Sequence, residues 1–133
     1  MTWYKKAAEN GDADAQHNVG WMYATGQGVA TNAELAFQWF LKSAETGEPG
    51  SQFEVARRYQ SGDGTASNIQ NAYHWLLILK GQKSQLAAHE WKQVEAFLNS
   101  IEKDVPGEAR GLAEASSRAW LEAYSRRYLH GLR

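Results

Sequence analysis

Apolar residues recur along this chain with a helical spacing inside a longer period of 36 residues. Val19 and Tyr23 stand four apart, as residues on one face of a helix do. A shift of 36 residues then aligns Trp3 with Trp39 and Trp39 with Trp75. This period is typical of arrays in which each unit is a pair of helices, and no alternating β-branched run suggests strands. The pattern therefore predicts an all-α repeat fold.

A turn with two glycines divides each unit into a first helix, which we call helix A, and a second, helix B. Segment 23–29, Tyr-Ala-Thr-Gly-Gln-Gly-Val, returns as segment 59–65, Tyr-Gln-Ser-Gly-Asp-Gly-Thr. Glycine adopts a positive φ without strain, so helix A is expected to end here. Capping boxes at 31–34 and 67–70 predict the start of helix B, with Asn32 and Asn68 as alternative caps one residue later.

These signals predict helices over about residues 13–24, 32–45 and 68–80, with a helix A between the last two. Gly20 either lets a neighbouring helix approach closely or is simply a tolerated helix glycine. The repeat fails after Gly81, because Glu95 stands where a third tyrosine is due. Two longer helices, over about 84–100 and 108–129, are expected to cap the array. The second has an apolar stripe at four-residue spacing, Leu112, Ser116, Trp120, Tyr124 and Tyr128, which Ala109, Ala113 and Ala123 widen.

Composition narrows the functional classes. The chain has 133 residues, 43% of them hydrophobic, and a net charge of −1, which predicts one globular domain without a general affinity for nucleic acid or membranes. Cysteine is absent, which excludes disulfides and thiolate chemistry. The sequence shows no secretory leader or membrane-spanning run, so a cytoplasmic location is expected unless a leader has been lost with a missing part of the chain.

The sequence contains no convincing catalytic motif. The four histidines, at positions 17, 74, 89 and 130, lack the spacing of a helical metal site, although a zinc site assembled from distant residues stays open. The glycine turns lack the lysine and serine of a phosphate loop. Ser100 and Lys103 spell S-x-x-K, but the companion motifs of such hydrolases are missing. We therefore predict no catalytic, cofactor-binding or metal-binding residues.

The repeated residues resemble the Sel1-like repeat, a relative of the tetratricopeptide repeat. The resemblance is carried by Gly11, Ala15, Gly20, Tyr23, Gly26, Gly28, Val29, Ala36, Trp39, Phe40, Lys42, Ala44 and Gly47. It divides the chain into a closing half-repeat (3–11), a repeat (12–47), a degenerate repeat (48–83) and capping helices (84–133). The second repeat departs from the family pattern with Thr65 for valine, and both have asparagine, at 32 and 68, where aspartate is favoured.

The resemblance implies a right-handed α-α superhelix of antiparallel helix pairs, serving as a non-catalytic protein-binding scaffold, often bacterial. Helix A lines the concave face of such an array. The partner-binding residues expected there are Asn18, Trp21, Thr25, Glu54, Arg57, Arg58 and Ser61. Trp21 beside the two arginines suits a peptide with an acidic or aromatic anchor. The alternative is that Trp21 packs against the next helix and the arginines are a solvated face.

The sequence is also compatible with two other functions. A few relatives have been ascribed hydrolase activity on cell-wall or β-lactam substrates. The second alternative is that the chain is a structural fragment of a longer scaffold. In that case the apolar edge formed by Trp3, Tyr4 and Ala7 lacks a preceding helix, which predicts a homodimer through that edge.

Overall fold

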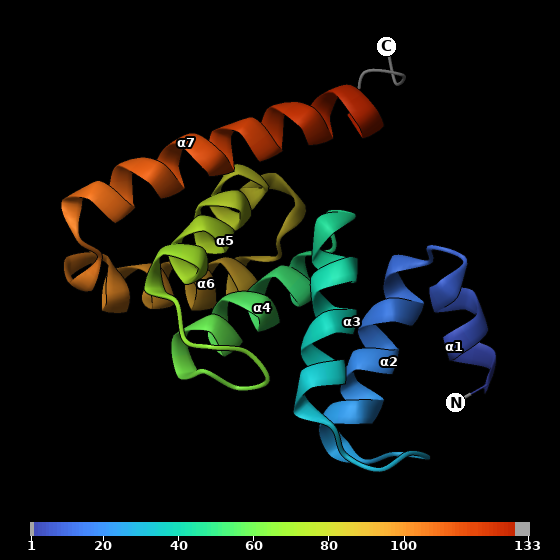
Figure 1. The fold of residues 1–133 in the computed structure, drawn as a ribbon. Helices are drawn as coiled ribbons and strands as arrows, with labels where there is room; N and C mark the ends of the chain where they lie inside the picture. Colours follow the sequence, from blue (N-terminus) through green and yellow to red (C-terminus); the bar gives the residue numbers. More distant parts are fainter. Residues whose placement is uncertain (1, 130–133) are drawn as a thin grey trace.

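The computed structural model describes residues 2–129, and their regular structure is helical throughout (Figure 1). The α-helices are α1 (Thr2–Glu9), α2 (Ala13–Thr25), α3 (Ala33–Glu45), α4 (Pro49–Ser61), α5 (Ile69–Gly81), α6 (Ala88–Ile101) and α7 (Gly107–Tyr124). Short 3₁₀ turns, Lys83–Gln85 and Glu102–Asp104, flank α6, and a π-helical turn, Ser125–Leu129, ends the described chain. The predicted all-α fold is confirmed.

The two repeats form antiparallel pairs, α2 with α3 and α4 with α5, and α3 packs against α4 to join them. α1 packs against α2 in the position of a helix B. The core follows the period, because Val19 and Val55 are both fully buried. Phe40 and Leu76, also 36 residues apart, are buried in the same way. The repeat in the sequence is thus a repeat of core positions.

Helix B starts one residue later than the capping boxes suggest. The side chain of Asn32 accepts a hydrogen bond from the Leu35 amide (3.0 Å), and Asn68 accepts one from the Asn71 amide (2.9 Å). Both asparagines are extended, as a residue that precedes the first helical one must be. The asparagine alternative is therefore confirmed, and Thr31 and Ser67 are not the caps.

Close packing explains Gly20. A Cβ atom there would lie 2.8 Å from the ring of Phe40, so α2 and α3 approach each other closely only because position 20 has no side chain. The turn glycines behave as predicted: Gly26 and Gly62 end α2 and α4 in the left-handed conformation, with φ of 78° and 77°.

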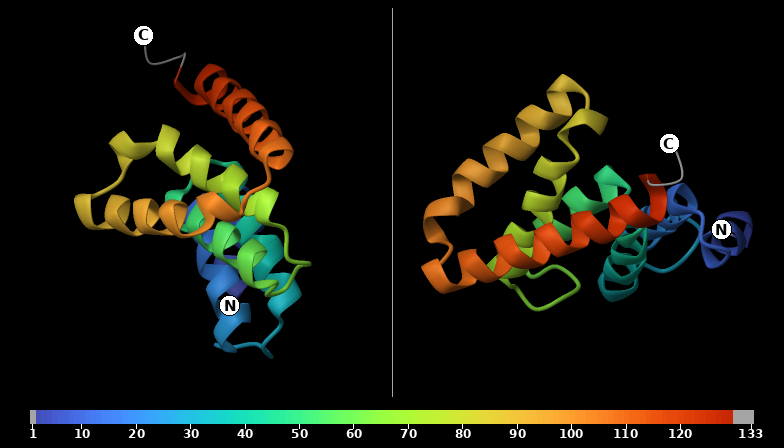
Figure 2. Two further views of the ribbon diagram at one scale, coloured as in Figure 1. Left: turned by 90° about the vertical axis from the view of Figure 1, so that its left-hand side faces the viewer. Right: turned by 90° about the horizontal axis from the view of Figure 1, so that it is seen from above.

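The C-terminal helices do not form a third hairpin. α6 and α7 diverge from the turn at Glu102–Asp104, and α7 packs along α5 instead (Figure 2). Tyr124 lies against Gly47 in the α3–α4 turn, and the Trp120 indole donates to Glu45 Oε2 (3.1 Å). α7 therefore crosses both repeats.

The predicted stripe on α7 is correct only in its middle. Ser116, Trp120 and Tyr124 contact the repeats, but Leu112 is 53% exposed. Ala113, which was predicted to widen the stripe, is buried, and so is Ser117, which was not. A strict spacing of four drifts around an α-helix of 3.6 residues per turn, so Leu112 rotates away from the core. Tyr128, which is 40% exposed, lies in the π-helical turn that follows α7.

Candidate functional site

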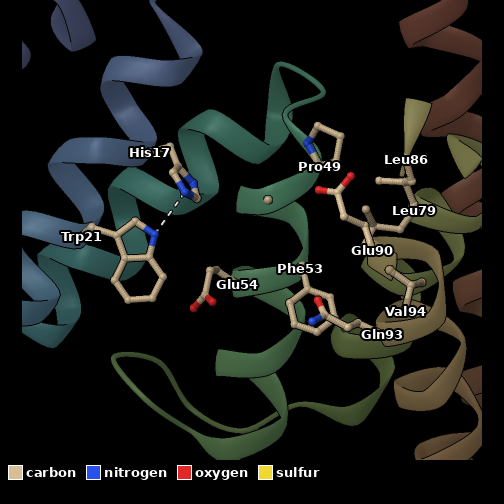
Figure 3. A pocket seen from close by; sticks show the side chains of 11 residues that line it. His17, Trp21, Pro49, Phe53, Glu54, Leu79, Leu86, Glu90, Gln93 and Val94 are labelled. Carbon is tan, nitrogen blue, oxygen red and sulfur yellow. Dashed lines mark hydrogen bonds between the residues drawn. The ribbon is translucent and has the colours of Figure 1, made fainter. Parts of the chain in front are cut away.

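A groove of about 270 Å³ lies where α2, α4 and α6 come together. Figure 3 shows the side chains of α2 on one wall and those of α4 and α6 on the other. The residues that line it are His17, Trp21, Pro49, Gly50, Phe53, Glu54, Leu79, Leu86, Glu90, Gln93 and Val94.

The α2 wall is built on a hydrogen bond between two side chains one helical turn apart. Trp21 Nε1 donates to His17 Nε2 (3.0 Å). An indole N–H is only a donor, so His17 Nε2 accepts and the proton of the neutral ring resides on Nδ1. Trp21 also packs edge-on against Phe40, with ring centroids 5.3 Å apart. Both contacts hold the half-buried indole in one orientation at the groove.

A chain of hydroxyls anchors His17 from behind. His17 Nδ1 lies 2.6 Å from Ser51 Oγ, and the protonated nitrogen donates to it. Ser51 then donates to Ser43 Oγ (2.8 Å), and Ser43 donates to the Ala13 carbonyl (2.8 Å). Every donor has one acceptor in this series, which ties α2, α3 and α4 together beneath Trp21.

The opposite wall is apolar with polar groups at its edge. Phe53 of α4 packs edge-on against Phe97 of α6, with ring centroids 5.7 Å apart. Glu54 lies between Trp21 and Phe53, while Glu90 and Gln93 reach the groove from α6 (Figure 3). Glu54 Oε2 accepts from Arg57 (2.7 Å) and Glu90 Oε1 accepts from the Ala87 amide (2.8 Å).

The predicted partner-binding residues divide into three groups. Trp21 and Glu54 line the groove. Exposed positions outside its lining are occupied by Asn18, Thr25, Arg57 and Ser61, and Thr25 Oγ1 donates to the Trp21 carbonyl (2.7 Å). For Arg58 the prediction of an accessible partner-binding residue is wrong. Its side chain is only 4% exposed, because it pairs with Asp63 (2.7 Å) and Glu54 (3.5 Å) and packs under the Phe40 ring. It presents no free charge to a ligand.

Several lining residues were absent from the sequence prediction. His17 and Phe53 are one repeat apart and both line the groove, so the 36-residue period contained the signal. The sequence prediction instead named the equivalent residues at positions 18 and 54, which come one residue later on helix A. Glu90, Gln93 and Val94 belong to α6, which has no copy in the chain, so no periodic signal could point to them.

The metal and nucleophile arrangements considered from the sequence are not formed within the part of the chain that the structure describes. No group of three His, Cys, Asp or Glu side chains within residues 2–129 is placed to hold a metal ion, and His130 lies outside that range. His17 and Ser51 do not form a nucleophilic pair open to substrate. Ser51 is fully buried, and Glu48 lies 3.3 Å from the same Nδ1 atom, where a triad needs its acid on the other nitrogen. Ser100 donates to the Phe97 carbonyl of its own helix (2.7 Å).

None of the helices described is long and apolar enough to cross a membrane. The fold and groove together define a protein of the α-solenoid class, built from two-helix repeats. The chain belongs to the Sel1 repeat family, whose model matches residues 1–12, 13–47 and 49–78.

Two solved structures show the same fold. A Sel1 repeat protein from Oxalobacter formigenes is 33% identical, with a TM-score of 0.63 over 71% of this chain and 69% of that one. The protein c5321, described as a protective antigen of uropathogenic Escherichia coli strains with this repeat fold, is 25% identical. Its TM-score is 0.79 over 95% of this chain but only 26% of its own. The comparison with curated proteins gives no match.

Proposed function

We propose that this protein is a non-catalytic interaction module that binds an extended segment of a partner protein in the α2–α4–α6 groove. The observation that supports it is Trp21, a half-buried tryptophan fixed by His17 and Phe40 at the edge of a cleft. Tryptophan is among the residues that dominate binding energy at interfaces. A side chain already held in place loses little further freedom on binding, which favours affinity.

The family supports the non-catalytic reading, since Sel1 repeat proteins are typically non-catalytic. The similar structures come from bacteria, which supports a bacterial scaffold. The cytoplasmic location and the identity of the partner stay predictions.

A library of displayed peptides tests the proposal. Peptides selected on the wild-type protein are titrated against Gln93→Trp, which fills the groove from an exposed lining position, and against Lys92→Trp, its exposed neighbour outside the lining. Loss of a buried anchor contact is expected to weaken binding to Gln93→Trp by about tenfold or more. Lys92→Trp should bind as the wild type does. Equal binding to both variants would refute the groove as the site.

The edge of α1 supports a second proposal, self-association. Trp3 is 87% exposed, whereas its equivalents Trp39 and Trp75 are only 9% and 3% exposed because a neighbouring helix covers each of them. The adjacent Tyr4 is 45% exposed as well, and exposed apolar residues that lie together mark interaction surfaces. We expect sedimentation to show a dimer that Trp3→Glu dissociates, while Lys5→Glu on the same helix leaves it intact. A strict monomer at high concentration would contradict this proposal.

A further inference from the structure

We propose that the groove selects a partner segment that inserts an arginine or lysine side chain between Trp21 and Phe53. This inference rests on the proposed function and specifies the chemistry of the bound segment. It reverses the acidic anchor expected from the sequence, because that expectation relied on Arg57 and Arg58. Arg57 is paired with Glu54, and Arg58 is buried and paired with Asp63.

The charges at the groove favour a cationic ligand. The charged side chains in its lining are Glu54 and Glu90, and no lysine or arginine is among the lining residues. Each carboxylate accepts a hydrogen bond through one oxygen, Oε2 of Glu54 and Oε1 of Glu90. Within residues 2–129, the second oxygen of each accepts none. Glu54 is only 9% exposed, so a further donor there would meet an anion with little access to water.

The charged groups next to the lining do not cancel the negative charge of the groove. Two carboxylates, of Glu54 and Glu90, belong to the lining, and two more, of Glu48 and Asp63, lie beyond it beside His17 and Arg58. Two guanidinium groups lie next to these carboxylates: Arg57 pairs with Glu54, and Arg58 lies 5.9 Å from the centroid of the Trp21 ring. Arg57 and Arg58 are paired with Glu54 and Asp63, which leaves two carboxylates in excess. Glu48 lies behind His17, 3.3 Å from Nδ1. A positive group is therefore attracted to the groove, and an acidic anchor is repelled.

The aromatic walls suit the rest of such a side chain. Trp21 and Phe53 flank Glu54 in Figure 3, so a side chain entering between them meets rings beside a carboxylate. Lysine and arginine have a long apolar stem that packs on rings and a charged end that also interacts with ring faces. A purely apolar anchor would cover the carboxylates without supplying a donor, which is unfavourable.

Four pools of seven-residue peptides, which differ only in a fixed central residue, provide the test. The central residue is arginine, lysine, norleucine or glutamate, and each pool is titrated into the ¹⁵N-labelled protein. The Trp21 indole N–H resonance reports on the groove. We expect the arginine and lysine pools to shift it at the lowest concentrations.

Glu90→Gln removes the charge but keeps the hydrogen bond to Ala87, and should weaken binding of the cationic pools about three- to tenfold. Glu95→Gln, an exposed residue of α6 outside the groove lining, is the matched control and should change nothing. The norleucine pool should bind both variants alike.

Each other result has a defined meaning. If the norleucine or glutamate pool shifts the Trp21 resonance first, the groove binds peptides but the charge inference is wrong. If Glu90→Gln leaves the cationic pools unchanged, the carboxylate is not the recognition element and the inference also fails. If no pool moves the Trp21 resonance, both this inference and the proposed function are overturned.

Discussion

Single buried polar side chains hold each repeat to the next. Gln16 Nε2 donates to the Ala8 carbonyl (3.1 Å), and Gln52, one period later, donates to the Ala44 carbonyl (3.2 Å). Each glutamine thus gives an additional donor to a carbonyl near the end of the preceding helix B, where the backbone amide three residues further on also donates to it. Gln52 also donates to Gln82 Oε1 (2.9 Å), and Gln82 donates to the Gly47 carbonyl (3.0 Å).

Replacing Gln52 by alanine should destabilise the fold strongly. The substitution leaves Gln82 Oε1 without its donor, removes one of the donors to the Ala44 carbonyl, and opens a cavity at a fully buried site. The expected loss in the free energy of unfolding is about 2 to 4 kcal/mol. Gln60→Ala, at an exposed position of the same helix, should change it by less than about 0.5 kcal/mol. Chemical denaturation of both variants measures the difference, and similar values would contradict the role of the network.

His17 should be found with its proton on Nδ1. This tautomer follows from the donor-only indole of Trp21, which requires an unprotonated Nε2. Long-range ¹H–¹⁵N correlation spectra near neutral pH distinguish the two ring nitrogens directly. His89, which is exposed, is the internal reference. A His17 spectrum with the proton on Nε2 would show that the Trp21 hydrogen bond is not formed.

At the scale of the elements, the two-glycine turn does more than end a helix. Gly62 closes α4 in the left-handed conformation, and the next glycine, Gly64, brings the turn against the first residue of α3. A Cβ atom on Gly64 would collide with the Ala33 carbonyl oxygen. The second glycine thus sets how closely the α4–α5 turn packs on the preceding repeat.

The two glycines should differ in how they tolerate alanine. Gly62→Ala meets only ordinary contacts, so the strain of a positive φ, about 1 to 2 kcal/mol, should be its main effect. Gly64→Ala has the same strain, at φ 79°, and adds a backbone collision, so its loss should exceed about 3 kcal/mol. Thermal unfolding of the pair tests this. Equal losses would mean that the turn moves away from α3 at little cost.

Most of what repeats could be predicted from the sequence, and most of what does not repeat could not. The helix pairs and the turn glycines follow from residues that recur every 36 positions, and the close contact at Gly20 follows from a small residue there, with Ala56 one period later. The groove depends on α6, and the packing of Tyr124 on Gly47 depends on the path of α7. Those contacts join segments far apart in the chain that have no second copy, so neither spacing nor propensity indicates them.

For the molecule as a whole, α7 packs across both repeats. Its interface with α5 contains His74, a histidine whose protonation state can change with pH. His74 Nδ1 lies 2.7 Å from Ser116 Oγ, between α5 and α7. Burial lowers the pKa of His74 from its ordinary value of 6.5, because the charged ring loses hydration. The unfolded chain therefore takes up this proton at a higher pH than the folded chain does.

The stability of the protein should consequently fall as the pH drops below about 6.5, since only the unfolded state gains the His74 proton there. Above that pH both states are neutral at this position, and the contribution is fully present. His74→Asn removes the titrating group and retains a side chain that can reach Ser116, so the decline between about pH 7.5 and pH 5.5 should become shallower. His89→Asn, at an exposed position, should keep the wild-type profile. Denaturant unfolding followed at several pH values measures both, and a His74→Asn profile parallel to the wild type would show that the α5–α7 seam does not exclude the charged ring.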